Sequence, residues 1–181
     1  MIDTIPTLLQ IDLQNLFFQA RSMGGQRVDL EKIWDAINNR ESEFLVDALI
    51  YMIRGESFDS SKFEALLKKV GYSLKIKNSI KTVKGGKTFY RQSNQDVAIT
   101  IDCMARLDSF QKWILMSGDG DFVDLCQYLK KKNKKIEIWS FKETFNPILE
   151  PYADKINIIT EDFFIKKSNI SVFGFNYGDL P

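Results

Sequence analysis

Short apolar runs alternate along the chain with segments in which apolar residues recur at helical spacing. The runs, each compatible with a buried strand, cover 7–12, 44–53, 112–117, 135–140 and 156–159. The segments with helical spacing cover 28–38, 60–70, 95–107 and 122–132, with a shorter one at 147–153. Strands that alternate with helices predict an α/β fold, here a three-layer α/β/α sandwich with a mostly parallel central sheet.

Two segments add detail to this pattern. Residues 72–82 alternate apolar side chains with lysines, and Gly85-Gly86 predicts a turn into 88–90, so a hairpin is expected there. In the helix predicted at 95–107 one side is apolar, as in an amphipathic helix. That side consists of Val97, Ile101, Met104 and Leu107.

The length of 181 residues suits one compact domain, which we place at 1–165. The tail at 166–181 combines glycine with aromatic residues, and we expect it to dock on its own domain or on a second copy, as in a homodimer. The sequence shows neither a signal peptide nor an apolar run of roughly 18 residues, which predicts a cytoplasmic protein without a membrane partner. Cys103 and Cys126 fall in predicted helices and are expected to be core thiols.

Two features of the composition narrow the chemistry. The chain contains 0 histidines, which excludes Ser-His-Asp and Cys-His catalysis and zinc sites built on histidine. The net charge is +1, yet residues 62–91 carry nine basic residues and one acid, Glu64. Such a basic block favours an anionic partner, of which nucleic acid is the commonest, although a solvated lysine-rich face would have the same composition.

Acidic residues follow the predicted strands at two places. Asp12 ends the strand at 7–12, and Asp119 and Asp121 follow the strand at 112–117. Asp96 opens the helix that leads into the second of these strands. Because parallel strands end at one edge of a sheet, we expect the four carboxylates to converge there.

Each of these acids also has a purely structural interpretation. Asp119 fits an Asx turn, Asp121 fits a helix N-cap, and Asp96 complements the positive end of its helix. Capping explains Asp12 less well, because an acid that directly follows a buried strand is costly to leave unpaired.

Together the four acids predict a metal site. Two carboxylates about 5 Å apart repel each other by roughly 3 kcal/mol at an effective dielectric constant near 20. A hard divalent cation, Mg²⁺ or Mn²⁺, would remove this repulsion and activate a water molecule near neutral pH. Asn15 and Ser117 are candidates to hold a carboxylate or the attacking water. The chemistry suits phosphodiester hydrolysis, with a backbone guided by basic residues of the hairpin: Lys81, Lys84, Lys87 and Arg91.

Four sequence segments, three of which carry the candidate acids, occur in the same order in a known family. The segments are Ile11 to Phe17, Asp96 to Ile99, Ile114 to Phe122 with its Ser-Gly-Asp-x-Asp-Phe sequence, and Pro151 to Asp154. Over 7–165 the chain resembles the NYN domain, LabA-like branch, of the PIN-like nuclease superfamily. The resemblance implies a PIN-like fold and a Mg²⁺- or Mn²⁺-dependent nuclease, acting on RNA, with Asp12, Asp96, Asp119 and Asp121 as its acidic cluster.

The chain departs from the family pattern in two places, and two other functions stay open. Leu13 stands where a glycine is usual, and Ser93-Asn94-Gln95 stands where Lys-Gly is frequent; both differences concern substrate contacts. One alternative is a non-catalytic module that binds or regulates RNA. Another is a phosphatase of the haloacid dehalogenase type, because Asp119-x-Asp121 after a strand resembles its nucleophile motif. Asp102, about 120° from Asp96 around the helix, is expected to form salt bridges instead.

Overall fold

The computed structural model describes residues 4–22, 27–54, 60–84, 87–91 and 95–165. The predicted turn at Gly85-Gly86 and the tail at 166–181 lie outside these residues, so the predicted docking of the tail and the homodimer remain predictions. Within the described ranges, no helix combines the length and the apolar character that crossing a bilayer requires.

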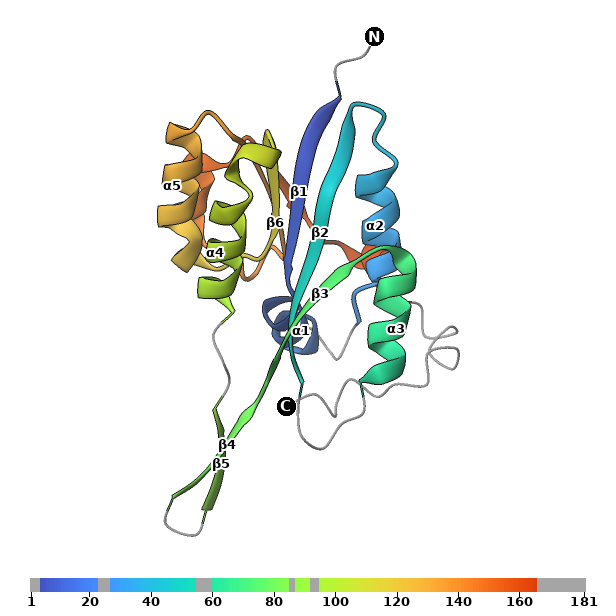
Figure 1. Ribbon diagram of the computed structural model, residues 1–181, viewed down its shortest axis with the longest axis vertical. Helices are drawn as coiled ribbons and strands as arrows, with labels where there is room; N and C mark the ends of the chain where they lie inside the picture. The colour runs from blue at the N-terminus through green and yellow to red at the C-terminus, as the bar shows by residue number, and fades with distance from the viewer. Residues whose placement is uncertain (1–3, 23–26, 55–59, 85–86, 92–94, 166–181) are drawn as a thin grey trace.

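A six-stranded sheet forms the middle of the molecule (Figure 1). All neighbouring strands run parallel, in the order β3-β2-β1-β6-β7-β8. The strands are β1 (Ile5–Asp12), β2 (Glu43–Arg54), β3 (Ser73–Asn78), β6 (Lys112–Met116), β7 (Lys135–Ser140) and β8 (Lys155–Ile158). The predicted parallel sheet is therefore confirmed.

Helices cover both faces of this sheet (Figure 1). One face carries α1 (Leu13–Ser22), α2 (Leu30–Asn38) and α3 (Ser61–Val70), and the other carries α4 (Asp96–Ala105) and α5 (Val123–Lys131). Four short 3-10 helices complete the described elements: η1 (Leu107–Ser109), η2 (Gly120–Phe122), η3 (Pro147–Tyr152) and η4 (Glu161–Phe163). The three layers are those predicted.

The pleat of β1 divides the core into two apolar clusters. Leu9 and Ile11 pack with α1, α2 and α3, whereas Leu8 packs with α4 and α5. Because side chains alternate along a strand, Gln10 and Asp12 share the side of Leu8 and face the layer of α4 and α5. Both cysteines lie buried and unpaired in that layer, so the prediction of core thiols is confirmed.

A separate hairpin extends past the end of the sheet. Its strands, β4 (Ile80–Lys84) and β5 (Lys87–Arg91), are antiparallel and form a sheet of their own. The predicted hairpin is confirmed, although the single run expected at 72–82 is split between β3 and β4. Figure 1 shows the hairpin projecting beyond the edge at which β1 and β2 end.

One helix was missed, and one expectation about a helix was wrong. Helix α1 was not predicted. Helix α4 turns its predicted apolar side to solvent: Val97 and Ile101 are each 62% exposed and Met104 is 38% exposed. Ile99 and Cys103 are buried in their place. Because α4 is apolar on more than one side, spacing alone does not tell which side meets the sheet.

Candidate metal centre and active site

The four predicted acids lie at the edge where the parallel strands end. Asp12 is the last residue of β1, Asp119 and Asp121 follow β6, and Asp96 is the first residue of α4. The chain continues from β1 to β2 and β3 on one side, and reaches β6, β7 and β8 on the other. The acids therefore gather at the point where the strand order reverses, which is where open α/β sheets bind ligands.

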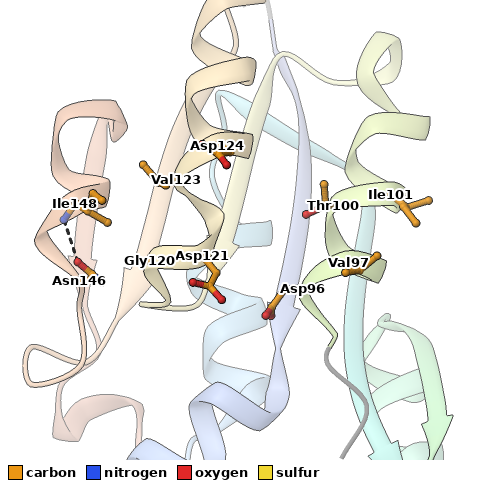
Figure 2. A pocket seen from close by; sticks show the side chains of 10 residues that line it. All are labelled: Asp96, Val97, Thr100, Ile101, Gly120, Asp121, Val123, Asp124, Asn146 and Ile148. Atoms are coloured by element: carbon orange, nitrogen blue, oxygen red, sulfur yellow. Dashed lines mark hydrogen bonds between the residues drawn. The ribbon is translucent and has the colours of Figure 1, made fainter.

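Three of the carboxylates are close neighbours. One oxygen each of Asp96, Asp119 and Asp121 lies within 4.8 Å of the other two. Asp96 and Asp119 are half-buried and Asp121 is exposed. Figure 2 shows Asp96, at the start of α4, opposite Asp121 in the turn that precedes α5. Three negative charges at this spacing repel one another, and a hard cation with oxygen ligands would stabilise them.

Asp12 lies beside this group without belonging to it. Its side chain is only 5% exposed. The pKa of Asp12 is raised to about 6: burial is the largest cause, the charges of Asp96 and Asp119 add to it, and hydrogen bonds from the backbone N–H groups of Asn15 and Gln14 act in the opposite direction. Asp12 is therefore close enough to Asp96 and Asp119 for their charges to raise its pKa.

The environment of Asp12 also corrects an expectation. The backbone N–H of Asn15 donates to Asp12 Oδ1 at 3.1 Å, so this carboxylate caps the first turn of α1. We expected capping to explain Asp12 poorly, and the sequence showed no sign of the cap because no helix was predicted directly after residue 12. Asp12 serves the helix and faces the other acids at the same time.

Two buried glutamines hold α4, and with it Asp96, against the sheet. Gln10 Nε2 donates to the Ile99 carbonyl of α4 at 3.1 Å, while its Oε1 accepts from Trp113 Nε1 at 2.7 Å. Gln95, directly before Asp96, donates from Nε2 to the Met52 carbonyl at 3.0 Å. These bonds fix the start of α4 relative to β1 and β2.

The loop after β6 is shaped by its own side chains. Ser117 Oγ, which is fully buried, accepts from the Asp119 backbone N–H at 3.3 Å. Asp119 Oδ1 accepts from the backbone N–H of Asp121 at 3.0 Å, which is the Asx turn that the sequence suggested. Asp121 is not the N-cap of α5, because Phe122 occupies that position.

Gly118 allows the same loop to pass close to the segment after β7. A Cβ atom at residue 118 would lie 2.3 Å from Ser140 Oγ and 2.6 Å from the Thr144 carbonyl oxygen. The Gly118 carbonyl accepts from the backbone N–H of Asn146 at 3.0 Å. Close backbone contact, which a side chain would prevent, therefore joins the two loops.

Asn15 connects α1 to this loop. Its Oδ1 accepts from Gln19 Nε2 at 2.5 Å and from the Gly118 backbone N–H at 3.4 Å. Asn15 and Ser117, which we expected to hold a carboxylate or water, thus have side-chain oxygens engaged in positioning the acidic loop.

An open groove of about 680 Å³ extends over the acids between α4 and η3, and we call it the α4–η3 groove. Its acidic residues are Asp96, Asp121 and Asp124, and its apolar residues are Val97, Ile101, Val123 and Ile148. In Figure 2, Val97 and Ile101 stand on α4 at one end, Ile148 stands on η3 at the other, and Asp121 lies between them. The groove brings exposed aliphatic side chains to both sides of the acidic cluster.

Sequence reasoning missed three residues that shape this region. Asp124 lies on α5 three residues after Asp121, a spacing that places both on one side of a helical segment. Asn146 precedes Pro147, the usual sequence at a helix start, and its Oδ1 accepts from the Ile148 N–H at 3.1 Å. Gln10 is a polar residue inside an apolar strand, which is a signal of a buried hydrogen-bonded group.

The predicted basic residues lie on the hairpin. Lys81 and Lys84 belong to β4, Lys87 and Arg91 belong to β5, and Lys84 lies opposite Lys87 in the register of the two strands. The hairpin leaves the sheet at the edge that carries the acids (Figure 1). The structure therefore brings both sets of residues to one end of the molecule.

Asp102 has the structural role predicted for it. Its carboxylate pairs with Lys75 at 3.1 Å and with Arg106 at 3.2 Å, and it accepts from the Tyr51 hydroxyl at 3.0 Å. These groups keep the pKa of Asp102 below its usual value despite its partial burial. Asp102 stabilises the packing of α4 against β2 and β3.

Comparison with known proteins identifies the family. The model of the NYN domain matches residues 6–159, which is most of the chain. The chain belongs to the NYN domain family. This NYN domain is 27% identical over 132 residues to the low amplitude and bright protein LabA of Synechococcus elongatus, covering 72% of this chain and 70% of that relative. The resemblance to the LabA-like branch is thereby confirmed.

A solved structure shares the fold of this NYN domain. The crystal structure of a protein of unknown function from Vibrio parahaemolyticus superposes with a TM-score of 0.78 at 24% identity. The superposition covers 91% of this chain and 99% of that one. The likeness confirms the α/β fold, and the family match favours a PIN-like nuclease over the haloacid dehalogenase alternative.

Proposed function

We propose that this NYN domain is a metal-dependent endoribonuclease, in which Asp12, Asp96, Asp119 and Asp121 hold a Mg²⁺ or Mn²⁺ ion. The observation that carries the proposal is the convergence of three carboxylates within 4.8 Å, beside the buried Asp12. Together with Asp12, these acids come from three segments that are far apart in the sequence. The family match supports nucleic acid as the substrate.

The donor set fits such an ion. The clustered ligands are carboxylate oxygens, which Mg²⁺ and Mn²⁺ prefer. The 4.8 Å spread slightly exceeds the roughly 4.2 Å that separates opposite ligands around an ion with contacts of about 2.1 Å. The exposed side chain of Asp121 has the freedom to close this difference. When bound, the ion would lower the pKa of a water molecule and offset the charge that develops on phosphorus.

The surrounding residues would serve the reaction by holding the acids in place. Asn15 and Ser117 act as positioning residues, because their side-chain oxygens bind the backbone of the acidic loop. Lys81, Lys84, Lys87 and Arg91 are proposed to guide the phosphodiester backbone from the hairpin. The free, buried cysteines suit a reducing compartment, which supports the predicted cytoplasmic location.

The test measures RNA cleavage and metal binding on the same proteins. We expect end-labelled RNA to be cleaved with Mn²⁺ or Mg²⁺ and to stay intact with EDTA, with Asp119→Asn and with Asp12→Asn. Mn²⁺ should raise the melting temperature of the parent and not that of Asp119→Asn. The matched control is Asp108→Asn, an exposed acid on η1, which should behave like the parent.

Other results would favour the alternatives. RNA that stays intact with every ion, together with salt-sensitive RNA binding and no thermal shift, would indicate a non-catalytic binding module. Release of phosphate from a small phosphomonoester would indicate a phosphatase.

A further inference from the structure

The α4–η3 groove exposes aliphatic side chains that the fold does not use. Val97 and Ile101 on α4 are each 62% exposed, and Ile148 on η3 is 51% exposed. These side chains do not belong to the two buried clusters that hold the layers together. Exposed aliphatic residues gathered beside a candidate active site are typical of a binding surface.

Acidic residues separate these aliphatic side chains into two groups. Figure 2 shows Ile148 at one end of the groove and Ile101 at the other, with Asp121 and Asp96 between them. A continuous apolar patch would suit a protein surface. An acidic centre with apolar residues on both sides suits a stretch of two nucleotides. In such a stretch a charged phosphate, held through a cation, lies between two flat and uncharged bases.

The charge of the groove points to the same occupant. Its titratable lining residues are Asp96, Asp121 and Asp124, so a phosphate is favourable only beside a bound cation. Nucleobases are uncharged and pack well on apolar side chains. The lysines and the arginine that would accompany the remaining phosphates lie on the hairpin, at the same edge of the sheet.

We propose that the α4–η3 groove binds the unpaired bases of the two nucleotides that flank the reacting phosphate. Val97 and Ile101 contact the base on one side, and Ile148 contacts the base on the other. This assignment takes the position of the phosphate from the proposed nuclease function. The preferred substrate is then a strand that has at least one nucleotide on each side of the cleaved bond, with the bases of both nucleotides unpaired.

The experiment compares two oligonucleotides that carry the same phosphates. One is a labelled single-stranded RNA of about ten nucleotides, and the other is an abasic strand of equal length. Both are bound in Ca²⁺, a hard cation that replaces Mg²⁺ so that the RNA is not cleaved during the measurement, and binding is followed by fluorescence anisotropy. The proteins are the parent, Ile101→Ala and Ile148→Ala. Met104→Ala is the matched control, because Met104 is exposed on α4 and does not line the groove.

We expect the parent to bind the RNA about tenfold more tightly than the abasic strand. Ile101→Ala and Ile148→Ala should each weaken RNA binding by about three- to fivefold and leave the affinity for the abasic strand unchanged. Met104→Ala should leave both affinities unchanged. Equal affinity of the parent for the two strands would overturn the proposal, as would an equal loss in Ile101→Ala and Met104→Ala.

Two further measurements separate this proposal from others. If sedimentation shows a dimer that Ile101→Ala dissociates, the groove holds a second copy of the chain and the proposal is wrong. If RNA stays uncleaved while the preference for bases persists, the nuclease function fails, and what stands is base binding by the groove without a reacting phosphate between the two bases. Cleavage at equal rates with and without the flanking bases would reject the groove assignment alone.

Discussion

At the scale of single residues, Asp12 combines two roles that usually fall to different side chains. Its carboxylate caps α1 through the backbone N–H of Asn15, and it faces the charges of Asp96 and Asp119. The cap favours the ionised form, whereas burial and the neighbouring acids oppose it. Burial is the largest of these effects, so the pKa rises to about 6.

The raised pKa predicts how the stability of the metal-free protein depends on pH. A carboxyl whose folded-state pKa lies above its unfolded value stabilises the fold fully at low pH, and this contribution is lost as pH rises through about 6. We therefore expect Asp12→Asn to raise the free energy of unfolding by about 1 to 3 kcal/mol near pH 8, and to change it little near pH 4. Urea unfolding in EDTA measures both values.

Two controls accompany this prediction. Asp108→Asn, which changes an exposed acid, should show no such pH-dependent difference from the parent. Adding Mn²⁺ near pH 8 should stabilise the parent and not Asp12→Asn. A variant less stable than the parent at both pH values would show that the cap outweighs the buried charge.

The sequence predicted the acids of the site better than their partners. The sequence could predict that Asp12, Asp96 and Asp119 lie near one another, because the ends of parallel strands share an edge whatever the details of packing. The roles of Asn15 and Gln10 depend on contacts with Gly118 and Ile99, which are remote in sequence. Such contacts are set by the packing of whole elements and leave no local signal.

At the scale of elements, the loop between β6 and η2 depends on close backbone contact. We expect Gly118→Ala to lower the free energy of unfolding by about 1 to 3 kcal/mol, because its Cβ would meet the Thr144 backbone at 2.6 Å. It should also weaken the Mn²⁺-induced thermal shift, since Asp119 and Asp121 lie in the same loop. Urea unfolding and a thermal-shift titration measure the two effects.

Gly120→Ala is the matched comparison for this loop. Its Cβ would first meet the Asn146 side-chain amide, at 2.3 Å, which can move away more easily than backbone. We expect a smaller loss of stability than in Gly118→Ala. Equal losses would contradict the role given to backbone contact at Gly118.

Elements whose pattern fits two interpretations were the ones predicted least well. Helix α4 has apolar residues on opposite sides, so spacing found a stripe that the structure exposes: Val97, Ile101 and Met104. Helix α1 follows β1 without a connecting loop, and its Leu13 and Leu16 continue the apolar run of the strand. No turn residue separates the two elements, which concealed the boundary between them.

The sequence also showed no sign that a charged residue, Glu137, is buried within a strand. Glu137 of β7 is fully buried, and it accepts hydrogen bonds from Arg40 and from Asn157, while Lys112 pairs with it. Burial alone would raise the pKa of Glu137, but the hydrogen bonds with Arg40 and Lys112 outweigh burial and lower the pKa to about 2. The sequence predicted the strand correctly, but these partners come from other elements.

At the scale of the whole molecule, opposite charges gather at one edge of the sheet. If the hairpin contacts phosphates, replacing Lys81, Lys84 and Lys87 with alanine should weaken RNA binding and reduce the slope of log K against log salt by about 2. Binding titrations over a range of salt concentrations measure this slope.

The matched control changes three lysines at the other end of the sheet. Lys131 and Lys132 lie at the end of α5, and Lys135 begins β7; all three are exposed. Their replacement with alanine alters the net charge equally and should leave the slope close to that of the parent. A similar decrease in both variants would show that net charge, and not the hairpin, determines the affinity.

The position of β1 in the middle of the sheet governs when the protein can fold as it is synthesised. Thr7 pairs with Lys112 of β6, so one side of β1 lacks its neighbour until more than half of the chain has left the ribosome. At about 5 to 20 residues per second, this delay is on the order of 5 to 20 s. Until then the nascent chain cannot bring Asp119 and Asp121 beside Asp12, so the acidic cluster forms only late in the synthesis of the domain.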